Sequence, residues 1–369
     1  MSKLAVIGAS YLQFPLVQKA REMGIYTLCF AWEDGAVCKG IADEFYPISI
    51  VEKERILQIC QEKQIDGICT IASDVAAPTV AFVAEQMGLV GNPYEAALRA
   101  SNKYLMRNAF VKSGVLCPGY NVVTSLDEIQ GNLTFPLIVK PTDRSGSLGI
   151  TKVDSLANLS PAVEKALGYS FKHEAIIEEY IEGREISVEF ISYQGKHYPL
   201  QITDKVTTGT PHFVELAHHQ PANLDQKQYE EMYELTQKAL NALGVMNGAS
   251  HSEYKITAEG QAVVMEIGAR MGGDFIGSDL VYLSTGYDFL KGVIDVALGR
   301  FVEPIFGKRQ YSGVFFLCEE TKHLYEHFLR QDVPQIVRSE ITDPSLRRVL
   351  CSADRSGYMI YQDNKRLVL

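Results

Sequence analysis

The sequence Ala249-Ser-His-Ser-Glu-Tyr-Lys-Ile256 is followed, after the turn residues Thr257–Gly260, by Ala262-Val-Val-Met-Glu-Ile-Gly-Ala-Arg-Met-Gly-Gly273. Both runs begin with residues typical of β-strands, and the turn between them therefore predicts an antiparallel hairpin. Neighbouring antiparallel strands can bring two carboxylates, Glu253 and Glu266, to one face of a sheet. Mg²⁺ prefers such oxygen ligands, usually with substrate phosphates completing its shell, and Mn²⁺ could use them too. The hairpin therefore predicts a metal site, and an ordinary surface pair of glutamate and arginine is the alternative.

The residues after the second glutamate predict a catalytic group. Side chains alternate along a strand, so Glu266, Gly268 and Arg270 point to the same side if the extended geometry persists. Arg270 would then reach a carboxylate or a transferring phosphoryl group near the metal ions. Gly272 and Gly273 follow in a turn that could offer backbone N–H groups to an anionic substrate. We therefore expect Arg270 to be catalytic.

One histidine belongs to the same hairpin. His251 shares a face with Glu253 by the same alternation of side chains along the strand. It could contact substrate, orient a metal ligand or be an ordinary buried histidine. The residues alone leave all three alternatives open.

A second segment has the composition of a phosphate-binding loop. Pro141–Gly149 follows a strand that ends at Lys140, and it is rich in glycine and serine. Backbone N–H groups of such a turn, around Ser145, Gly146 and Ser147, can lie along phosphate oxygens, and the lysine adds a positive charge. The loop matches neither the P-loop pattern nor the dinucleotide-binding glycine pattern. Taken alone, it is equally compatible with an ordinary hairpin turn.

A third segment combines acidic residues with a turn. Ile177–Glu185 carries several glutamates on the edge of a predicted strand that turns at Gly183. Its backbone could hydrogen-bond a base, and Glu185 could accept hydrogen bonds from ribose hydroxyls. The alternative is a charged, solvated turn.

The first hundred residues alternate strand-like and helix-like stretches. Leu4–Gly8, Tyr26–Phe30 and Gly67–Ile71 are the expected strands, and repeated βα units of this length predict a parallel, doubly wound sheet. Ligands approach such sheets at the carboxyl ends of the strands, one of which is Ala72–Asp74. Ser101 is predicted to cap a helix that runs to about residue 113.

The rest of the chain predicts a different architecture. From Pro136 onward paired strands predominate, and the long helix Asp225–Leu243 precedes the hairpin. Tyr311–Leu317 is strand-like and Lys322–Arg330 is helical, so the last part predicts a small α+β cap. Arg338, Arg355 and Tyr358 in this cap could approach substrate or be ordinary surface residues.

Composition excludes several classes of protein. Apolar residues make up 46% of the 369 residues and charged residues 22%, as in a globular chain with two or three folded units. The formal charge is −10, without a basic stripe for nucleic acid or a basic patch for a membrane surface. The seven cysteines show no metal-ligand spacing and are interpreted as reduced thiols. We therefore expect a cytoplasmic protein that binds neither nucleic acid nor membrane.

Taken in order, these segments resemble the ATP-grasp superfamily, in particular its carboxylate–amine ligase branch with the L-amino-acid ligases and the biotin-carboxylase-like enzymes. The resemblance covers roughly residues 1–300. It implies an N-terminal pre-ATP-grasp domain over residues 1–93 and a two-lobed ATP-grasp domain over 94–300, with a mobile lid at about 119–180. Residues 301–369 would form the small α+β extension. The expected fold class is thus mixed α/β and α+β.

The resemblance also implies roles for individual residues. Lys103 and Lys140 would contact phosphate, and residues 144–149 would be the mobile loop over it. The residues expected to clasp adenine and ribose are Glu178, Glu179, Tyr180, Ile181 and Glu185. Glu253 and Glu266 occupy the family's magnesium positions. The chain departs from the family at Gly268, where many members have asparagine, so another group must complete the metal shell.

A further segment, Thr207–His219, resembles the substrate-facing loop of the amino-acid-ligase branch. His212, Glu215 and His218 could therefore contact the acceptor or its ammonium group. A plain edge strand is the alternative interpretation, because polar and apolar residues alternate imperfectly here.

The activity implied by the resemblance is ATP-dependent formation of an amide or peptide bond. A carboxylate and an amine would be the small-molecule substrates, ATP and Mg²⁺ the cofactors, ADP and phosphate the products, and a homodimer the assembly. Alternatives are an ATP-grasp enzyme acting on bicarbonate or a purine-pathway intermediate, or a non-catalytic nucleotide-binding protein. An oxidoreductase is disfavoured, because Val6–Ser10 is not followed by the remaining glycines of a dinucleotide-binding turn.

Overall fold

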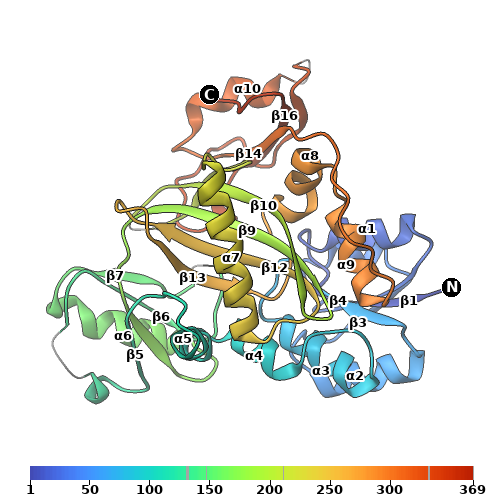
Figure 1. Ribbon diagram of the computed structural model, residues 1–369, viewed down its shortest axis with the longest axis horizontal. Helices are drawn as coiled ribbons and strands as arrows, with labels where there is room; N and C mark the ends of the chain where they lie inside the picture. The colour runs from blue at the N-terminus through green and yellow to red at the C-terminus, as the bar shows by residue number, and fades with distance from the viewer. Residues whose placement is uncertain (130–132, 147, 211, 331–332, 369) are drawn as a thin grey trace.

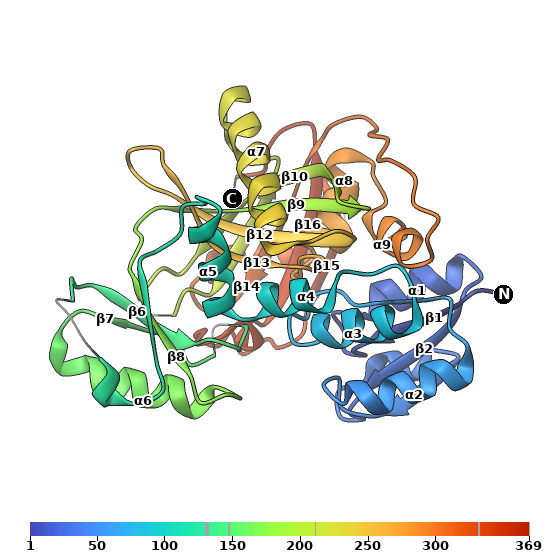
Figure 2. The ribbon, with the colours of Figure 1, turned by 60° about the horizontal axis from the view of Figure 1, so that its bottom comes forward.

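The computed structural model describes residues 1–129, 133–146, 148–210, 212–330 and 333–368. Within these ranges the chain forms two four-stranded sheets and one eight-stranded sheet (Figure 1). Figure 2 shows the two smaller sheets on opposite sides of the molecule, with the large sheet between and above them. None of the described helices is both long and apolar enough to cross a membrane.

The N-terminal sheet is parallel, with strand order β3-β2-β1-β4. Alternate residues of β1 face opposite sides: Leu4 and Val6 pack with α1, whereas Ala5 and Ile7 pack with α2 and α3. Helices therefore cover both faces, which confirms the predicted doubly wound sheet. The elements are β1 (Lys3–Ile7), α1 (Phe14–Glu22), β2 (Tyr26–Ala31), β3 (Glu44–Pro47), α2 (Lys53–Lys63), β4 (Gly67–Cys69) and α3 (Ala77–Met87).

The middle of the chain forms a small antiparallel sheet, seen at the lower left of Figure 1. Its strand order is β5-β8-β6-β7, and helix α6 packs its buried leucines and alanines against one face. The elements are β5 (Tyr120–Val123), β6 (Leu137–Pro141), β7 (Thr151–Val153), α6 (Leu159–Tyr169) and β8 (Ala175–Glu179). The loop from Lys140 to Gly149 joins β6 to β7, so its described residues lie at one end of this sheet.

The large sheet is antiparallel throughout, with strand order β13-β12-β9-β10-β11-β14-β16-β15. The predicted hairpin is present as β12 and β13, and β11 pairs with strands on both sides, so the edge-strand interpretation of Thr207–His219 is wrong. The strands are β9 (Arg184–Tyr193), β10 (Lys196–Thr207), β11 (Glu215–Gln220), β12 (Gly248–Ile256), β13 (Ala262–Gly268), β14 (Tyr311–Leu317), β15 (Ile336–Ile341) and β16 (Gly357–Asp363).

The two faces of this sheet differ in chemistry. On one face Val188, Tyr254 and Ile267 belong to an apolar core beneath α7 (Gln226–Leu243), which crosses the sheet in Figure 1. Because side chains alternate along strands, the neighbouring residues Glu189 and Glu253 project from the opposite face. The apolar face packs against the helix, and the polar face carries side chains of the candidate site.

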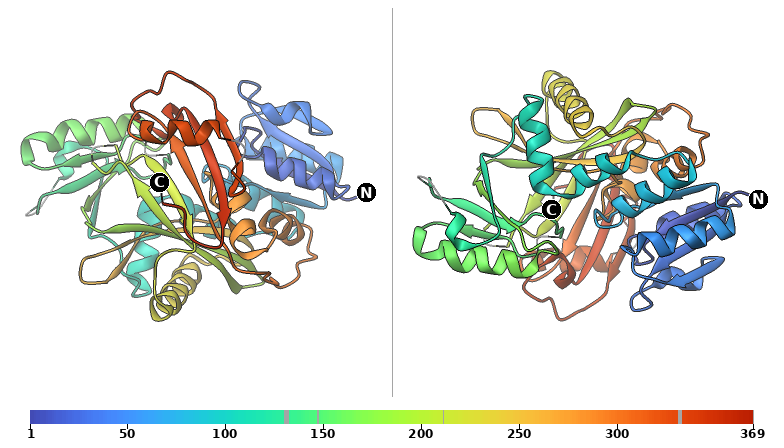
Figure 3. Two further views of the ribbon diagram at one scale, coloured as in Figure 1. Left: turned by 90° about the horizontal axis from the view of Figure 1, so that it is seen from above. Right: turned by 90° about the horizontal axis from the view of Figure 1, so that it is seen from below.

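Three strands near the C-terminus extend the large sheet, so this part does not form the separate cap that the sequence predicted. Strands β14, β15 and β16 continue it beyond β11, and α10 (Tyr325–Leu329) packs on them. Figure 3 shows these strands running across the centre of the molecule, between the two smaller sheets. Between β13 and β14 lie a π-helical turn (Ile276–Leu280), α8 (Val281–Thr285) and α9 (Phe289–Ala297). Helix α9 packs with α1 in one apolar core, which ties this part to the N-terminal sheet.

One helix boundary differs from the prediction. Ser101 does not cap a helix: it is the last residue of α4 (Tyr94–Ser101), and its hydroxyl donates to the carbonyl of Ala97 at 2.9 Å. Asn102 instead caps α5 (Lys103–Lys112), and its side-chain oxygen accepts from the N–H of Leu105 at 3.0 Å. Both residue types favour the cap position, and tertiary packing selects the asparagine. The consequence is that Lys103 opens α5 as a buried residue.

Candidate active site

A cavity of about 420 Å³ is lined by residues from the two antiparallel sheets and from the segments that follow β1 and β4 of the N-terminal sheet. Its walls include these residues predicted from the sequence: Lys103, Lys140, Ser145, Gly146, Glu215, His218, His251, Glu253, Glu266, Arg270, Gly273 and Arg355. Others lie outside it: Glu178, Glu179, Ile181, Glu185, His212 and Gly272. Ser147 lies outside the described residues.

The two predicted metal carboxylates face each other across the hairpin. Glu253 and Glu266 are paired directly between β12 and β13, so both side chains project into the cavity. Each carboxylate has a lysine ammonium beside it: Lys103 Nζ lies 3.0 Å from Glu266 Oε1, and Lys205 forms an ion pair with Glu253. Both lysines are buried or nearly so, so each ammonium balances the charge of its carboxylate, and a metal ion would have to share or displace that contact.

This donor set suits a magnesium ion that shares its shell with phosphates. Among the described residues no three acidic, histidine or cysteine side chains form a closed metal site. Mg²⁺ is usually held by one or two carboxylates plus water and phosphate oxygens. Burial raises the pKa of the Glu253 carboxyl, but Lys205 and His251 outweigh it and hold that pKa well below its usual range. The carboxylate is therefore ionised and able to bind a cation.

Arg270 is held by a residue that the sequence analysis did not select. Its guanidinium donates to both carboxylate oxygens of Asp74, with distances of 2.8 and 2.7 Å. Asp74 follows β4 of the N-terminal sheet, at one of the strand ends where ligands were expected. Its place at this strand end was the only feature of the sequence that pointed to Asp74. The two residues are 196 positions apart, so no local pattern links them.

The position of Asp74 also explains why residue 268 is a glycine and not the asparagine that many ATP-grasp enzymes have there. A Cβ atom on Gly268 would lie 2.4 Å from Asp74 Oδ1 and 3.0 Å from Arg270 Nε. Such distances are far below van der Waals contact, so a side chain at position 268 cannot coexist with the Asp74–Arg270 pair. The space that an asparagine would occupy is filled by the carboxylate of Asp74.

We expect Gly268→Asn to lower the free energy of unfolding by about 1–3 kcal/mol, the usual cost of an overpacked site. The double variant Asp74→Ala/Gly268→Asn should lose less than the sum of the two single variants, because removing the carboxylate frees the space. Urea unfolding of the four proteins measures this coupling. Additive losses would contradict the steric conflict.

Lys140 is fixed by a buried carboxylate. Glu178 lies 2.7 Å from Lys140 Nζ and 2.7 Å from Arg107 Nε, and all three side chains are buried. Burial raises the pKa of the Glu178 carboxyl, but Arg107 and Lys140 outweigh it and lower that pKa to about 2. Burial lowers the pKa of Lys140 itself, and the contact with Glu178 opposes this. The side chain of Glu178 thus positions the lysine, while a backbone contact with adenine stays a prediction.

Replacing Glu178 with glutamine should cost about 3–5 kcal/mol of stability at neutral pH, because two buried cations lose their counter-charge. The carboxyl's pKa is lower in the folded state, so its stabilising effect is present above about pH 4.5 and is lost as the pH falls toward 2. The difference in unfolding free energy between the two proteins should therefore narrow below pH 4.5. Glu182→Gln, at an exposed neighbouring position, is the control. A difference that stays constant down to pH 3 would contradict the ion pairs.

The predicted adenine and ribose residues lie where the small antiparallel sheet joins the large one. Glu185 pairs with Lys255 at 3.4 Å, and Lys255 lies over the ring of Tyr180, 5.2 Å from its centroid. Glu179 is exposed, and Ile181 is half-buried. The sequence analysis did not select Lys255. It lies two residues after Glu253 on the same strand, and that spacing alone does not indicate a binding role. The nucleotide roles of these residues stay predictions.

The histidines of the cavity have different environments. His251 Nδ1 lies 2.5 Å from Glu189 Oε1, and its Nε2 lies 3.3 Å from Glu253 Oε1. Burial lowers the pKa of His251, but Glu189 outweighs it and raises that pKa to about 9. His218 is fully buried and lines the cavity, yet neither ring nitrogen has a hydrogen-bond partner among the described residues. His212 is half-buried and away from the cavity wall.

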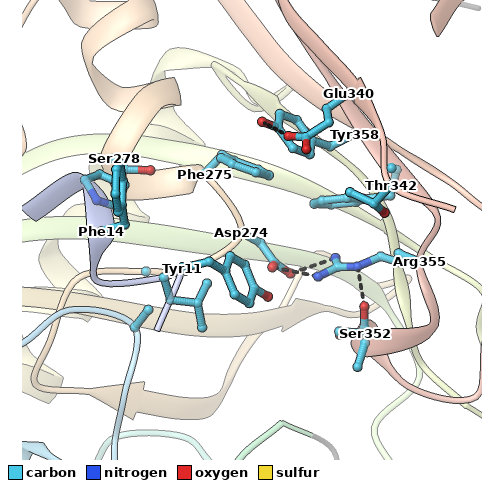
Figure 4. Close-up of a pocket in the computed structure, with 18 of the residues that line it drawn as sticks. Tyr11, Phe14, Asp274, Phe275, Ser278, Glu340, Thr342, Ser352, Arg355 and Tyr358 are labelled. Atoms are coloured by element: carbon cyan, nitrogen blue, oxygen red, sulfur yellow. Dashed lines mark hydrogen bonds and ion pairs between the residues drawn. The ribbon is translucent and has the colours of Figure 1, made fainter. Parts of the chain in front are cut away.

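A second cavity, of about 640 Å³, adjoins the first (Figure 4). The two share Tyr11, Asp274 and Arg355 among their lining residues. Arg338, Arg355 and Tyr358, for which the sequence left the role open, all line this second cavity. The C-terminal strands therefore supply part of its wall.

Comparison with known proteins identifies the fold and one domain. Residues 133–279 match the family model described as an ATP-grasp domain. Alanine–anticapsin ligase of Bacillus subtilis (strain 168) is 30% identical to the chain over an alignment of 247 residues, which covers 60% of this chain and 51% of that protein. The chain spans about half the length of the curated relatives it matches.

Two solved structures match almost the whole chain. An L-amino acid ligase from Bacillus licheniformis has a TM-score of 0.81 and 24% identity, covering 99% of this chain and 94% of that one. An N5-carboxyaminoimidazole synthetase from Staphylococcus aureus has a TM-score of 0.80 and 17% identity, with the same coverage. These likenesses confirm the predicted fold class.

Proposed function

We propose that this chain, whose residues 133–279 match the family model of an ATP-grasp domain, is an ATP-dependent carboxylate–amine ligase of that superfamily. It forms an amide or peptide bond through an acyl phosphate and releases ADP and phosphate. The observation that carries the proposal is the joint presence in one cavity of Glu253, Glu266, Lys103, Lys140 and Arg270. Phosphoryl transfer needs positioning and charge neutralisation more than a reactive side chain, and these groups supply both.

The proposed reaction has two steps. A substrate carboxylate oxygen attacks the γ-phosphorus of ATP, the bond to the β–γ bridging oxygen breaks, and ADP leaves. The amine then attacks the carbonyl carbon of the acyl phosphate and loses a proton, and the carbon–oxygen bond to phosphate breaks. Arg270 would stabilise the negative charge that gathers on the transferring group.

The remaining roles follow from position. Lys103 and Lys140 would hold phosphate oxygens, and Ser145 and Gly146 would cover them, together with Ser147 as predicted from the sequence. Glu253 and Glu266 would hold Mg²⁺, which neutralises phosphate charge when bound, and Mn²⁺ suits the same oxygens. The residues proposed to bind adenine and ribose are Glu178, Glu179, Ile181 and Glu185. The residues proposed to face substrate are Glu215, His251, Gly272 and Gly273, with His212 at the loop before β11.

His218 supports the substrate end of the cavity. A fully buried histidine whose ring nitrogens lack partners among the described residues loses hydrogen bonds that a ligand could restore. Burial holds the pKa of His218 well below its ordinary value, so the ring is neutral and can donate one hydrogen bond and accept another. We assign it to substrate contact.

We also place the reaction in the cytoplasm, and we propose a homodimer. The mobile lid is assigned to residues 119–180, between the pre-ATP-grasp domain at 1–93 and the remainder of the 94–300 domain, with 301–369 as the C-terminal extension. These limits can be tested by limited proteolysis with and without ATP, since a closed lid should protect the loop around Gly146.

Phosphate release with ATP and Mg²⁺, measured across an array of amino acids, other carboxylates and amines, tests the function. Release that depends on a specific pair, with ADP formed in equal amount, is the expected result. AMP and pyrophosphate would contradict the acyl-phosphate route. Release with bicarbonate alone would favour the bicarbonate alternative, and nucleotide binding without ADP formation on any substrate would favour a nucleotide sensor.

A further inference from the structure

We propose that the 640 Å³ cavity binds the side chain of an α-amino acid substrate that is large and aromatic. This inference rests on the proposed ligase function and names the substrate class that the site selects. The cavity lies beside the reaction cavity, and their shared walls allow one molecule to reach both. A substrate with its reactive group among the lysines and carboxylates would extend its side chain here.

Aromatic side chains from separate parts of the chain line this cavity. Tyr11 and Phe14 come from the N-terminal unit, Phe275 from the loop after β13, and Phe316 and Tyr358 from the C-terminal strands. Figure 4 shows Tyr11 and Phe14 near one side of the cavity and Phe275 and Tyr358 near another. Such walls favour a planar apolar group, because aromatic rings attract one another in offset or edge-on arrangements.

The far wall forms a stacked platform. The rings of Phe275 and Tyr358 lie 4.4 Å apart between centroids, and Phe316 lies 6.4 Å from Phe275. The guanidinium of Arg338 lies 5.4 Å from the centroids of both Phe275 and Tyr358, and an ion pair with Asp279 at 2.9 Å holds it there. A guanidinium beside aromatic rings adds a cation–π contact for an incoming ring and leaves no unpaired charge.

The boundary with the reaction cavity carries paired opposite charges. Arg355 donates to both oxygens of Asp274, at 2.9 and 2.7 Å, and both residues line both cavities (Figure 4). A carboxylate and a guanidinium side by side complement the ammonium and carboxylate of an α-amino acid. The unpartnered ring of His218 lines the reaction cavity with the same pair and adds a neutral hydrogen-bonding group.

The backbone that presents these groups is in a rarely adopted conformation. Asp274 has φ of 50° and Phe275 has φ of 66°, so two consecutive residues with side chains occupy the left-handed region. Such conformations are disfavoured for any residue with a Cβ and persist where the surroundings fix them, often at binding sites. Here they turn the carboxylate toward Arg355 and place the phenyl ring in the cavity wall.

The volume excludes a small side chain as the preferred occupant. Pockets of about 300–1,000 Å³ typically bury most of a drug-sized ligand, and 640 Å³ lies within that range. An alanine methyl would leave most of the aromatic wall in contact with water. An acidic side chain would lose hydration beside Arg338, which is already paired with Asp279, because the Arg355–Asp274 pair lies at the boundary and faces the α-amino and α-carboxylate groups.

Binding and turnover can be measured separately. Saturation-transfer NMR with ADP and Mg²⁺ present reports binding of phenylalanine, tryptophan, alanine and aspartate without any reaction. The ligation assay gives kcat/KM for the same amino acids. We expect aromatic amino acids to bind and to exceed alanine in kcat/KM by at least about tenfold.

Two variants that fill the cavity test its role. Ala353→Trp and Thr342→Trp each place a large ring at a residue that lines it. Either should remove the preference for aromatic amino acids while leaving the affinity for ADP unchanged. The matched control is Ala258→Trp, in the exposed turn between β12 and β13. ADP binding by calorimetry verifies that each variant is folded.

The outcomes separate this inference from the ligase function. Aromatic binding that is lost in both filled variants, with or without turnover, supports the subsite. Turnover that prefers alanine, or aromatic binding that persists in both filled variants, overturns it and leaves the ligase function intact. The order of residues in the product, read by fragmentation mass spectrometry, shows whether the aromatic amino acid supplies the carboxylate or the amine.

Discussion

Replacing Arg270 with alanine should lower kcat by at least about a thousandfold and leave the dissociation constant of ADP nearly unchanged. The guanidinium is largely buried in the cavity that holds both proposed metal carboxylates, and Asp74 fixes its orientation from the segment after β4. An arginine that stabilises a transferring phosphoryl group is worth about 10³–10⁵ in rate. ADP lacks that group, so its binding should depend on the lysines instead. Single-turnover ADP formation and calorimetry measure the two quantities.

Arg270→Lys tests geometry against charge. It keeps the positive charge but loses the planar fork that pairs with Asp74, so we expect only a small part of the activity to return. Arg347→Ala, at an exposed position with an ordinary surface ion pair, is the control for removing an arginine. Parallel loss of turnover and ADP binding in Arg270→Ala would contradict the assigned role and make Arg270 a structural or nucleotide-binding residue.

The second large effect is expected at the proposed metal site. Glu266→Gln should reduce the affinity for Mn²⁺ in the presence of ADP by at least about tenfold and kcat by about a hundredfold or more. An amide is a weaker ligand for a hard cation, and it also leaves Lys103 without its carboxylate partner. Electron paramagnetic resonance of free Mn²⁺ measures the affinity independently of turnover.

Glu259→Gln gives a matched comparison on the same hairpin. Glu259 lies in the exposed turn between β12 and β13, away from the cavity. Its replacement should change neither Mn²⁺ affinity nor kcat. Unchanged Mn²⁺ affinity in Glu266→Gln would show that the carboxylate is not a metal ligand and would reopen the interpretation of the hairpin as a surface pair of charges.

Local patterns in the sequence predicted the scaffold of this site. The hairpin was predictable because two apolar–polar runs flank a turn, and a turn of that length sets the pairing. That pairing alone would place Glu253 opposite Met265, and a β-bulge between Glu253 and Tyr254 shifts the register so that Glu253 lies opposite Glu266. Lys140 at the end of β6 and the glycine- and serine-rich loop after it follow from equally local signals.

Contacts between distant segments could not be predicted in this way. Asp74 meets Arg270 only because the N-terminal sheet packs beside the end of β13, and no periodicity encodes that approach. The same holds for Glu178, whose partners Arg107 and Lys140 come from α5 and β6. Arg355 and Tyr358 join the second cavity because β14–β16 extend the large sheet rather than forming a separate cap. Ser101 and Asn102 were equivalent as caps until packing distinguished them.

The central claim is that a substrate carboxylate attacks the γ-phosphorus of ATP. Once the substrate pair is known, the carboxylate substrate can be labelled with ¹⁸O on both oxygens and the released phosphate analysed by ³¹P NMR. The proposed reaction transfers one labelled oxygen from each carboxylate to phosphate, because the bridging oxygen of the acyl phosphate leaves with it. Phosphate without label, or label in AMP, would contradict the acyl-phosphate mechanism.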